Sequence, residues 1–338
     1  MQTVDITSSI DTAEPADWHR SLAAAVRDPD QLVDLLRLPD DYRKQARRAA
    51  DLFPLMVPHS FLMRMEPGNP EDPLLLQVLP LEAEQEDVSG FVPDALHEHS
   101  ARKAPGMLQK YAGRALLIAT GTCAVHCRYC FRKNYPYSQE PRRLEDWNPA
   151  LQAIAEDDSL REVILSGGDP LMLTDARLAA LCTALEKIPH LKRLRIHTRL
   201  PIVLPDRVTQ SFLEMFSSSR LTPIMVLHAN HPREIVGECA QALRTMVRSG
   251  MTVLNQAVLL RRINDSAEVL GDLCERLVDL GVIPYYLHQL DRVSGTAHFE
   301  VPQSKGCEII EQLRHRLPGY AVPQYVREVP GMLFKTPL

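Results

Sequence analysis

Three closely spaced cysteines, Cys123, Cys127 and Cys130, are the residues of this chain best suited to chemistry. They stand in the run CAVHCRYC, directly after the apolar stretch 115–119. Soft thiolates bind zinc or iron–sulfur clusters, and a structural zinc site normally has four ligands. Three cysteines without a matching fourth favour a cubane [4Fe–4S] cluster, whose remaining iron can bind a small molecule. The alternative is a zinc knuckle with His126 as the fourth ligand.

A second candidate site is the segment Ser166-Gly167-Gly168-Asp169, which follows a β-rich run and precedes a proline. Adjacent glycines after a strand allow the backbone to approach a ligand closely. An ordinary turn between a strand and a helix would give the same pattern, so the segment alone does not decide between the two.

Alternating strand and helix patterns from about residue 113 to 300 must position these segments. Short β-rich runs stand at 115–119, 162–166, 193–197, 223–228, 252–258 and 284–289. Helical patterns between them include 175–187, 206–216, 234–249 and 266–280. Six βα units predict parallel strands with right-handed crossovers. Because a closed (β/α) barrel has eight units, the α/β fold predicted here is a partial, open (β/α)6 barrel with its active site at the carboxyl ends of the strands.

The pattern divides the chain into three predicted parts. Residues 1–105 are a mainly helical, loop-rich region in which we find no chemical cluster, residues 106–300 form the barrel, and residues 301–338 form a C-terminal segment with one helix pattern at 304–316. The proline-rich stretch before residue 105 is the predicted boundary.

Composition excludes several classes of protein. The 338 residues include 38 basic and 43 acidic side chains, a net charge of −5 that argues against a general nucleic-acid binder. No apolar run approaches the roughly 20 residues of a membrane span, and the acidic N-terminus lacks a signal-peptide core. Seven cysteines without framework spacing predict a reduced, cytoplasmic chain. We expect the four cysteines outside the CAVHCRYC run to be buried and to pack like small hydrophobic residues; they are Cys182, Cys239, Cys274 and Cys307.

The CAVHCRYC run, with Tyr129 before its last cysteine, resembles the signature of the radical S-adenosylmethionine (SAM) superfamily. About 40 residues later the Gly-Gly-Asp segment resembles the motif that holds the amino group of SAM. The resemblance implies a [4Fe–4S] cluster whose open iron chelates SAM and a radical formed by reductive cleavage of SAM, and therefore a cellular electron donor. The SAM-binding residues that it implies are Ser166, Gly167, Gly168, Asp169, His197 and Gln256.

Five motifs narrow the resemblance to the lysine 2,3-aminomutase family: LSGGDPLM, RIHTRLPIVLP, NQAVLLRRIND, PYYLHQLD and the terminal KTPL. The N-terminal stretches DPDQLVDLL and RMEPGNPEDPLLLQVLP, and an end just after KTPL, resemble the shorter bacterial branch of that family. That branch makes (R)-β-lysine for modification of elongation factor P. The resemblance implies an isomerase that takes lysine, a functional link to elongation factor P and its lysyl ligase, and an oligomer as a possibility.

Family members also carry pyridoxal phosphate (PLP) on a lysine, which by matched position is Lys335. By base rate a lysine near the C-terminus is a solvated surface residue, but the resemblance makes it catalytic and implies that the tail is docked. Arg114, Lys110 and His228 match residues that bind PLP, with Lys110 in place of a usual arginine. The glycine run that precedes the family's lysine is replaced by Gly331-Met-Leu-Phe.

Substrate contacts follow from the same resemblance. Arg132 matches the arginine that binds the substrate carboxylate, although a surface arginine beside the cluster would look the same. Asp291 and Glu328 match the acidic pair that binds the side-chain ammonium of lysine, with Glu328 in place of a usual aspartate. The implied reaction moves the amino group from carbon 2 to carbon 3. Alternatives are an aminomutase for another amino acid and, from another class, a zinc-stabilised binding protein.

Overall fold

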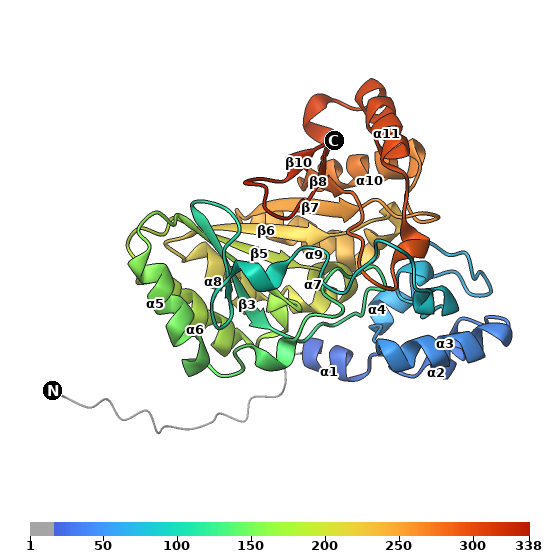
Figure 1. The fold of residues 1–338 in the computed structure, drawn as a ribbon, viewed down its shortest axis with the longest axis horizontal. Helices are drawn as coiled ribbons and strands as arrows, with labels where there is room; N and C mark the ends of the chain where they lie inside the picture. The colour runs from blue at the N-terminus through green and yellow to red at the C-terminus, as the bar shows by residue number, and fades with distance from the viewer. Residues whose placement is uncertain (1–16) are drawn as a thin grey trace.

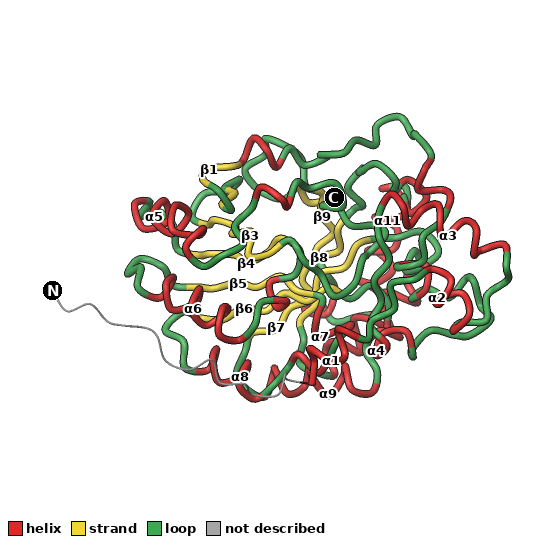
Figure 2. Tube along the Cα trace, turned by 90° about the horizontal axis from the view of Figure 1, so that it is seen from below, coloured by secondary structure: helices red, strands yellow, loops and turns green. Residues whose placement is uncertain are grey.

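One ten-stranded sheet forms the centre of the computed structural model, which describes residues 17–338. Seven strands are parallel neighbours in chain order: β3 (Arg114–Thr120), β4 (Glu162–Gly167), β5 (Arg193–Thr198), β6 (Thr222–His228), β7 (Thr252–Val258), β8 (Ile283–His288) and β9 (Gln324–Arg327). The hairpin of β1 (Arg102–Ala104) and β2 (Met107–Leu108) pairs antiparallel with β3, and β10 (Thr336–Pro337) pairs antiparallel with β9. Because β1 and β10 are the two ends of the strand order, the sheet is an open, partial barrel (Figure 2).

The predicted fold class and all six predicted strands are confirmed, but the parallel set has a seventh member. The sequence pattern missed β9 because the strand has only four residues and lies in a segment with proline and glycine on both sides. The omission matters, because β9 and β10 hold both ends of the C-terminal loop that carries Lys335.

Helices cover the outer side of the sheet, as Figures 1 and 2 show. They are α5 (Asn148–Glu156), α6 (Asp175–Glu186), α8 (Gln210–Ser217), α9 (Gly237–Arg248), α10 (Ala267–Asp279) and α11 (Gln303–Arg316), with the short α7 (Leu200–Val203) after β5. In β5, Leu194 and Ile196 are buried, whereas Arg195 and His197, which alternate with them, are half-buried and line the inner cavity. This alternation is the strand period of two, and it separates a packed outer face from a polar inner face.

The N-terminal region packs along the side of the barrel (Figure 1). Its helices are α1 (Asp17–Ala23), α2 (Pro29–Leu35), α3 (Asp41–Leu52) and α4 (His59–Leu62), and the Asp28 side chain caps α2. The guanidinium of Arg207 lies 4.9 Å from the ring of the fully buried Trp18, and Ser60 donates a hydrogen bond of 2.6 Å to the carbonyl of Val203. One hydrophobic core therefore includes residues of this region and of the barrel, while the predicted three-part division stays a prediction.

Two predictions about composition can be compared with the structure. Cys182, Cys239 and Cys274 are buried as predicted, but Cys307 is exposed, so that prediction is wrong. On α11 the core-facing positions are 306, 309, 310 and 313, which leaves Cys307 on the solvent side of the helix. In residues 17–338 no helix is long and apolar enough to cross a membrane. The N-terminus predicted to lack a signal peptide begins outside the described residues.

Candidate active site

A cavity of about 560 Å³ opens at the carboxyl ends of the strands. All sixteen residues predicted for the site line it: Lys110, Arg114, Cys123, Cys127, Cys130, Arg132, Ser166, Gly167, Gly168, Asp169, His197, His228, Gln256, Asp291, Glu328 and Lys335. The structure therefore brings together segments that are up to 225 positions apart, from Lys110 to Lys335. The individual roles of these residues stay predictions.

The loop that carries the three cysteines follows β3 and is held by hydrogen bonds from the N-terminal region. The backbone N–H of His126 donates to the carbonyl of Met56 at 3.0 Å, and that of Arg128 donates to the carbonyl of Gln77 at 2.9 Å. The Arg128 side chain is fully buried and makes two hydrogen bonds of 2.7 and 2.8 Å to the Glu84 carboxylate. The region in which the sequence showed no chemical cluster thus fixes the loop that carries the three thiols.

The three thiols fit a cluster better than a single ion. Burial, together with the neighbouring thiols, raises the pKa of Cys130 to about 11 and the pKa of Cys123 well above its usual value. Three adjacent thiolates therefore need positive charge between them. In residues 17–338 no three His, Cys, Asp or Glu side chains converge as one metal ion requires. A [4Fe–4S] cluster accepts thiols that stand further apart, because each thiolate binds a different iron.

The Gly-Gly-Asp segment lies directly against the end of β3. A Cβ on Gly168 would stand 2.3 Å from the carbonyl oxygen of Thr122, and one on Gly167, whose φ is +119°, would stand 2.5 Å from that of Thr120. The backbone N–H of Gly168 donates to Thr120 at 2.7 Å, and that of Asp169 donates to Thr122 at 2.8 Å. The glycines thus allow two strand ends to touch, a close approach of backbone to backbone where the sequence suggested an approach to a ligand.

Asp169 ties the end of β4 to the end of β5. Its carboxylate accepts four hydrogen bonds, from the Thr198 hydroxyl at 2.7 Å and from the backbone N–H groups of Leu171, Arg199 and Leu200 at 3.1, 2.6 and 3.1 Å. Burial nevertheless raises the pKa of this carboxyl group to about 6. All four donors come from the protein itself, so Asp169 acts here as a clamp between strands.

Neutral histidines line the inner face of the sheet. Burial lowers the pKa of His228 to about 3 and that of His197 well below its usual range. Gln256 Nε2 lies 2.6 Å from His228 Nε2, whereas His197 Nε2 is buried without a hydrogen-bond partner among the described residues. An unpartnered polar nitrogen on the wall of a cavity is costly unless a ligand satisfies it, so this wall fits a polar ligand.

Lys335 is docked by the hairpin of β9 and β10, as the resemblance implied. Thr336 pairs with Arg327, so Lys335 stands opposite Glu328 and its ammonium lies 2.5 Å from one carboxylate oxygen. The other oxygen lies 2.8 Å from the ammonium of Lys110. Burial would raise the pKa of Glu328, but the two ammonium groups lower it to about 2. Glu328 is therefore a carboxylate shared by two lysines.

Asp291 is an acidic group of the cavity that has no counter-ion among the described residues. Its carboxylate has no hydrogen bond or ion pair to any residue of the part of the chain that the structure describes, 17–338. Burial, and then the negative charge of Glu328, raise its pKa to about 7. A buried carboxyl group with a pKa near neutral pH would be ionised more readily beside a cation. Asp291 is therefore a candidate site for a cationic ligand.

Arg132 is held by a residue that the sequence did not indicate. Its Nε and Nη2 donate to the Glu98 carboxylate at 2.7 and 2.8 Å, and its Nη1 donates to Ser166 Oγ at 2.8 Å. A guanidinium has five N–H donors, so two remain for a ligand. Glu98 also lies 3.7 Å from the Lys110 ammonium. Glu98 opens a 3-10 helix of four residues, which is too short for a sequence pattern to reveal it.

A phosphate-bearing cofactor needs a cation that is free of ion pairs, and the cavity that Lys335 lines offers one. The Arg114 guanidinium stacks 4.6 Å from the Tyr111 ring and makes no ion pair with the carboxylates of residues 17–338. An amine and a guanidinium that is free of ion pairs both line this cavity and fit PLP.

Comparisons with known proteins agree with the site. A model of the Radical SAM superfamily matches residues 117–273. The L-lysine 2,3-aminomutase of Escherichia coli (strain K12) is 47% identical over 332 residues, which cover 98% of this chain and 96% of that protein. The chain belongs to the L-lysine 2,3-aminomutase family. Membership in this enzyme family confirms the resemblance and implies a [4Fe–4S] cluster, SAM and PLP as cofactors.

Other members of the L-lysine 2,3-aminomutase family are similar over nearly the whole chain. The L-lysine 2,3-aminomutase of Haemophilus influenzae is 44% identical, with 96% of each chain covered. That of Clostridium subterminale is 32% identical and covers 99% of this chain but 80% of its own length. The zinc-stabilised binding protein considered from the sequence is therefore excluded as the protein's class.

Proposed function

We propose that this protein isomerises L-lysine to β-lysine by moving the amino group from carbon 2 to carbon 3. The observation that supports the proposal most is the lining of one cavity. It is lined by three thiols, by Lys335 and by an acidic group, Asp291, that lacks a counter-ion among the described residues. Membership in the aminomutase family supports the same reaction.

Cys123, Cys127 and Cys130 would hold the cluster, and Lys335 would hold PLP. When bound, the reduced cluster supplies an electron to SAM, and PLP supplies an aldehyde that holds the migrating amino group. His197 and Gln256 would satisfy polar groups of SAM, since the former has a nitrogen without a partner.

The two ends of lysine match the two ends of the substrate site. The α-carboxylate would take the two free N–H donors of Arg132, whose guanidinium Glu98 fixes in one orientation. The side-chain ammonium would lie between Asp291 and Glu328, and its charge would favour the ionised form of Asp291. A substrate with an acidic side chain, such as glutamate, would instead place a second anion beside these carboxylates.

We further propose that the product is (R)-β-lysine, used to modify elongation factor P through its lysyl ligase. The support is the identity of 47% and 44% to the Escherichia coli and Haemophilus influenzae relatives, against 32% to that of Clostridium subterminale. The proposed compartment is the cytoplasm, where a reducing environment suits seven free cysteines and an electron donor is at hand.

Anaerobic assays with lysine, glutamate and alanine, each with SAM, PLP and dithionite, test the proposal. We expect β-lysine from lysine and no comparable product from the other two amino acids, and chiral chromatography should show the R enantiomer. Faster conversion of glutamate than of lysine would refute the substrate assignment. The S enantiomer would refute the link to elongation factor P while leaving the reaction intact.

A further inference from the structure

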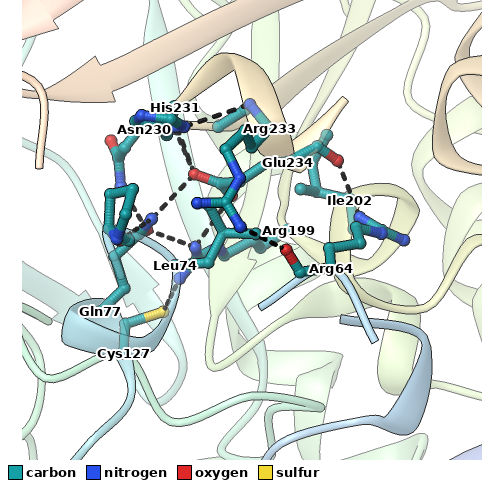
Figure 3. A network of polar contacts seen from close by, with 12 residues as sticks. Arg64, Leu74, Gln77, Cys127, Arg199, Ile202, Asn230, His231, Arg233 and Glu234 are labelled. Carbon is teal, nitrogen blue, oxygen red and sulfur yellow. Dashed lines mark hydrogen bonds and ion pairs between the residues drawn. The ribbon is translucent and has the colours of Figure 1, made fainter. Parts of the chain in front are cut away.

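One buried arginine contacts a thiol of the proposed cluster and has no role so far. Arg199 follows β5 at the carboxyl end of the strand, and its Nη1 lies 2.7 Å from Cys127 Sγ (Figure 3). Its backbone N–H donates to the Asp169 carboxylate at 2.6 Å, so the residue is anchored from both its main chain and its side chain. The side chain is 6% exposed.

The guanidinium of Arg199 is fixed in one orientation. Its Nη2 donates to Glu234 at 3.0 Å and to the side-chain carbonyl of Gln77 at 2.6 Å. The rings of Phe61 and Tyr129 lie 5.3 and 5.6 Å from its central carbon. A planar cation stacked on aromatic rings and hydrogen-bonded along its edge has little freedom to turn away from the thiol.

The partner carboxylate is fixed as well. Glu234 is fully buried, and one of its oxygens accepts from the backbone N–H groups of Asn230 and His231 at 2.8 and 3.0 Å and from Gln77 Nε2 at 3.0 Å. Its other oxygen faces Arg199. The network in Figure 3 is therefore a rigid ion pair whose positive end points at Cys127.

We propose that Arg199 is a positioning residue that raises the reduction potential of the cluster by donating a hydrogen bond to its ligand Cys127. The inference rests on the proposed function, because it requires the cluster. Hydrogen bonds to the ligand sulfurs and local net charge set the potential of iron–sulfur clusters. Reduction adds one negative charge to the cluster, so a fixed cation beside a ligand sulfur stabilises the reduced form.

Glu234 gives the proposal a test of sign. Its carboxylate is the negative end of the same ion pair, so it opposes the effect of Arg199 on the cluster. Neutralising Arg199 should therefore disfavour the reduced cluster, whereas neutralising Glu234 should favour it. A loosened protein, by contrast, would shift the potential of both variants in one direction through greater exposure of the cluster to solvent.

The experiment is a redox titration of the reconstituted full-length protein under anaerobic conditions, followed by electron paramagnetic resonance of the reduced cluster. In Arg199→Gln we expect the equilibrium constant for one-electron reduction of the cluster to fall at least tenfold, which lowers the potential by at least about 59 mV. In Glu234→Gln we expect a shift to higher potential. Arg64→Gln is the matched control, because Arg64 donates to the backbone carbonyls of Ile202 and Glu234 and contacts no cysteine of the cluster. The reduction potential of the cluster in this variant should be unchanged.

An unchanged potential in Arg199→Gln at full cluster occupancy, or shifts of the same sign in both charge variants, would overturn the inference alone. Loss of SAM binding with an unchanged potential would also overturn it and would place Arg199 against SAM instead. If the Arg199→Gln protein does not fold, Glu234→Gln decides the sign with Arg199 in place. Failure of the unsubstituted chain to bind iron and sulfide would refute the proposed function and this inference together.

Discussion

Replacing Asp291 by asparagine should make the ligand-free protein more stable and the enzyme worse at binding lysine. The pKa of Asp291 is about 7 in the folded chain because the carboxylate is buried beside Glu328, against about 3.9 in an unfolded chain. Since one pH unit corresponds to about 1.36 kcal/mol, the ionised carboxylate destabilises the fold by about 4 kcal/mol. Asparagine has nearly the same shape and removes the charge.

The pH dependence follows from the sign of this shift. Because the pKa of Asp291 is higher in the folded than in the unfolded chain, its destabilisation of the fold is absent below about pH 4, grows as the pH rises and is complete above about pH 7. Urea unfolding of the ligand-free chain should therefore show that Asp291→Asn increases the free energy of unfolding by about 4 kcal/mol at pH 8 but by about 1.5 kcal/mol at pH 5. Saturating lysine should remove much of the advantage at pH 8, since its ammonium stabilises the ionised Asp291.

The lysine requirement should rise at the same time. Loss of one partner of a buried charge pair typically costs about 2–5 kcal/mol of binding, so the KM for lysine should increase by at least tenfold with cluster and PLP content unchanged. In the unsubstituted enzyme, lysine binding should weaken as the pH falls below about 7, as Asp291 takes up a proton. An equal change in unfolding free energy at pH 5 and pH 8, or unchanged lysine kinetics, would refute this reasoning.

Three further outcomes are expected. Borohydride reduction with PLP, followed by peptide mapping, should label Lys335, and a label on Lys110 would contradict the assignment. Cys127→Ala should abolish cluster-dependent SAM cleavage while circular dichroism shows an intact fold, and full cleavage after reconstitution would count against the three-cysteine site. Glu328→Asp should lower lysine turnover less than Asp291→Asn does, because it keeps the negative charge between Lys110 and Lys335. Equal losses of turnover would mean that the length of the Glu328 side chain matters more than its charge.

The sequence predicted the barrel because its signals are local. Six strands repeat a β-rich run followed by a helical period, and the cysteine and Gly-Gly-Asp segments follow two of them directly. The carboxyl ends of parallel strands lie at one edge of the sheet, which explains why the cysteines and the Gly-Gly-Asp segment line one cavity. Lys110, Arg114 and Lys335 do not follow such strand ends, and only the family resemblance indicated them. The strand β9 was missed because four residues between prolines and glycines carry no period.

The contacts that orient the site could not be predicted, because they join residues far apart in the chain. Glu98 holds Arg132 across 34 positions, and Gln77 reaches Arg199 across 122 positions. Glu98 and Gln77 belong to 3-10 helices of three or four residues, which are too short to show a sequence period, so their roles are recognised only when their partners are seen. Arg199 did have a signal, since it follows β5 at the carboxyl end of the strand, as the cysteines follow β3.

The most direct test of the proposed reaction follows one nitrogen atom. Lysine labelled with ¹⁵N at its α-amino group is incubated with the reconstituted protein, SAM, PLP and dithionite, and the product is examined by nuclear magnetic resonance. A 2,3-amino migration predicts the label on carbon 3 of β-lysine. Label that stays on carbon 2, or β-lysine whose nitrogen on carbon 3 is unlabelled, would contradict the proposal.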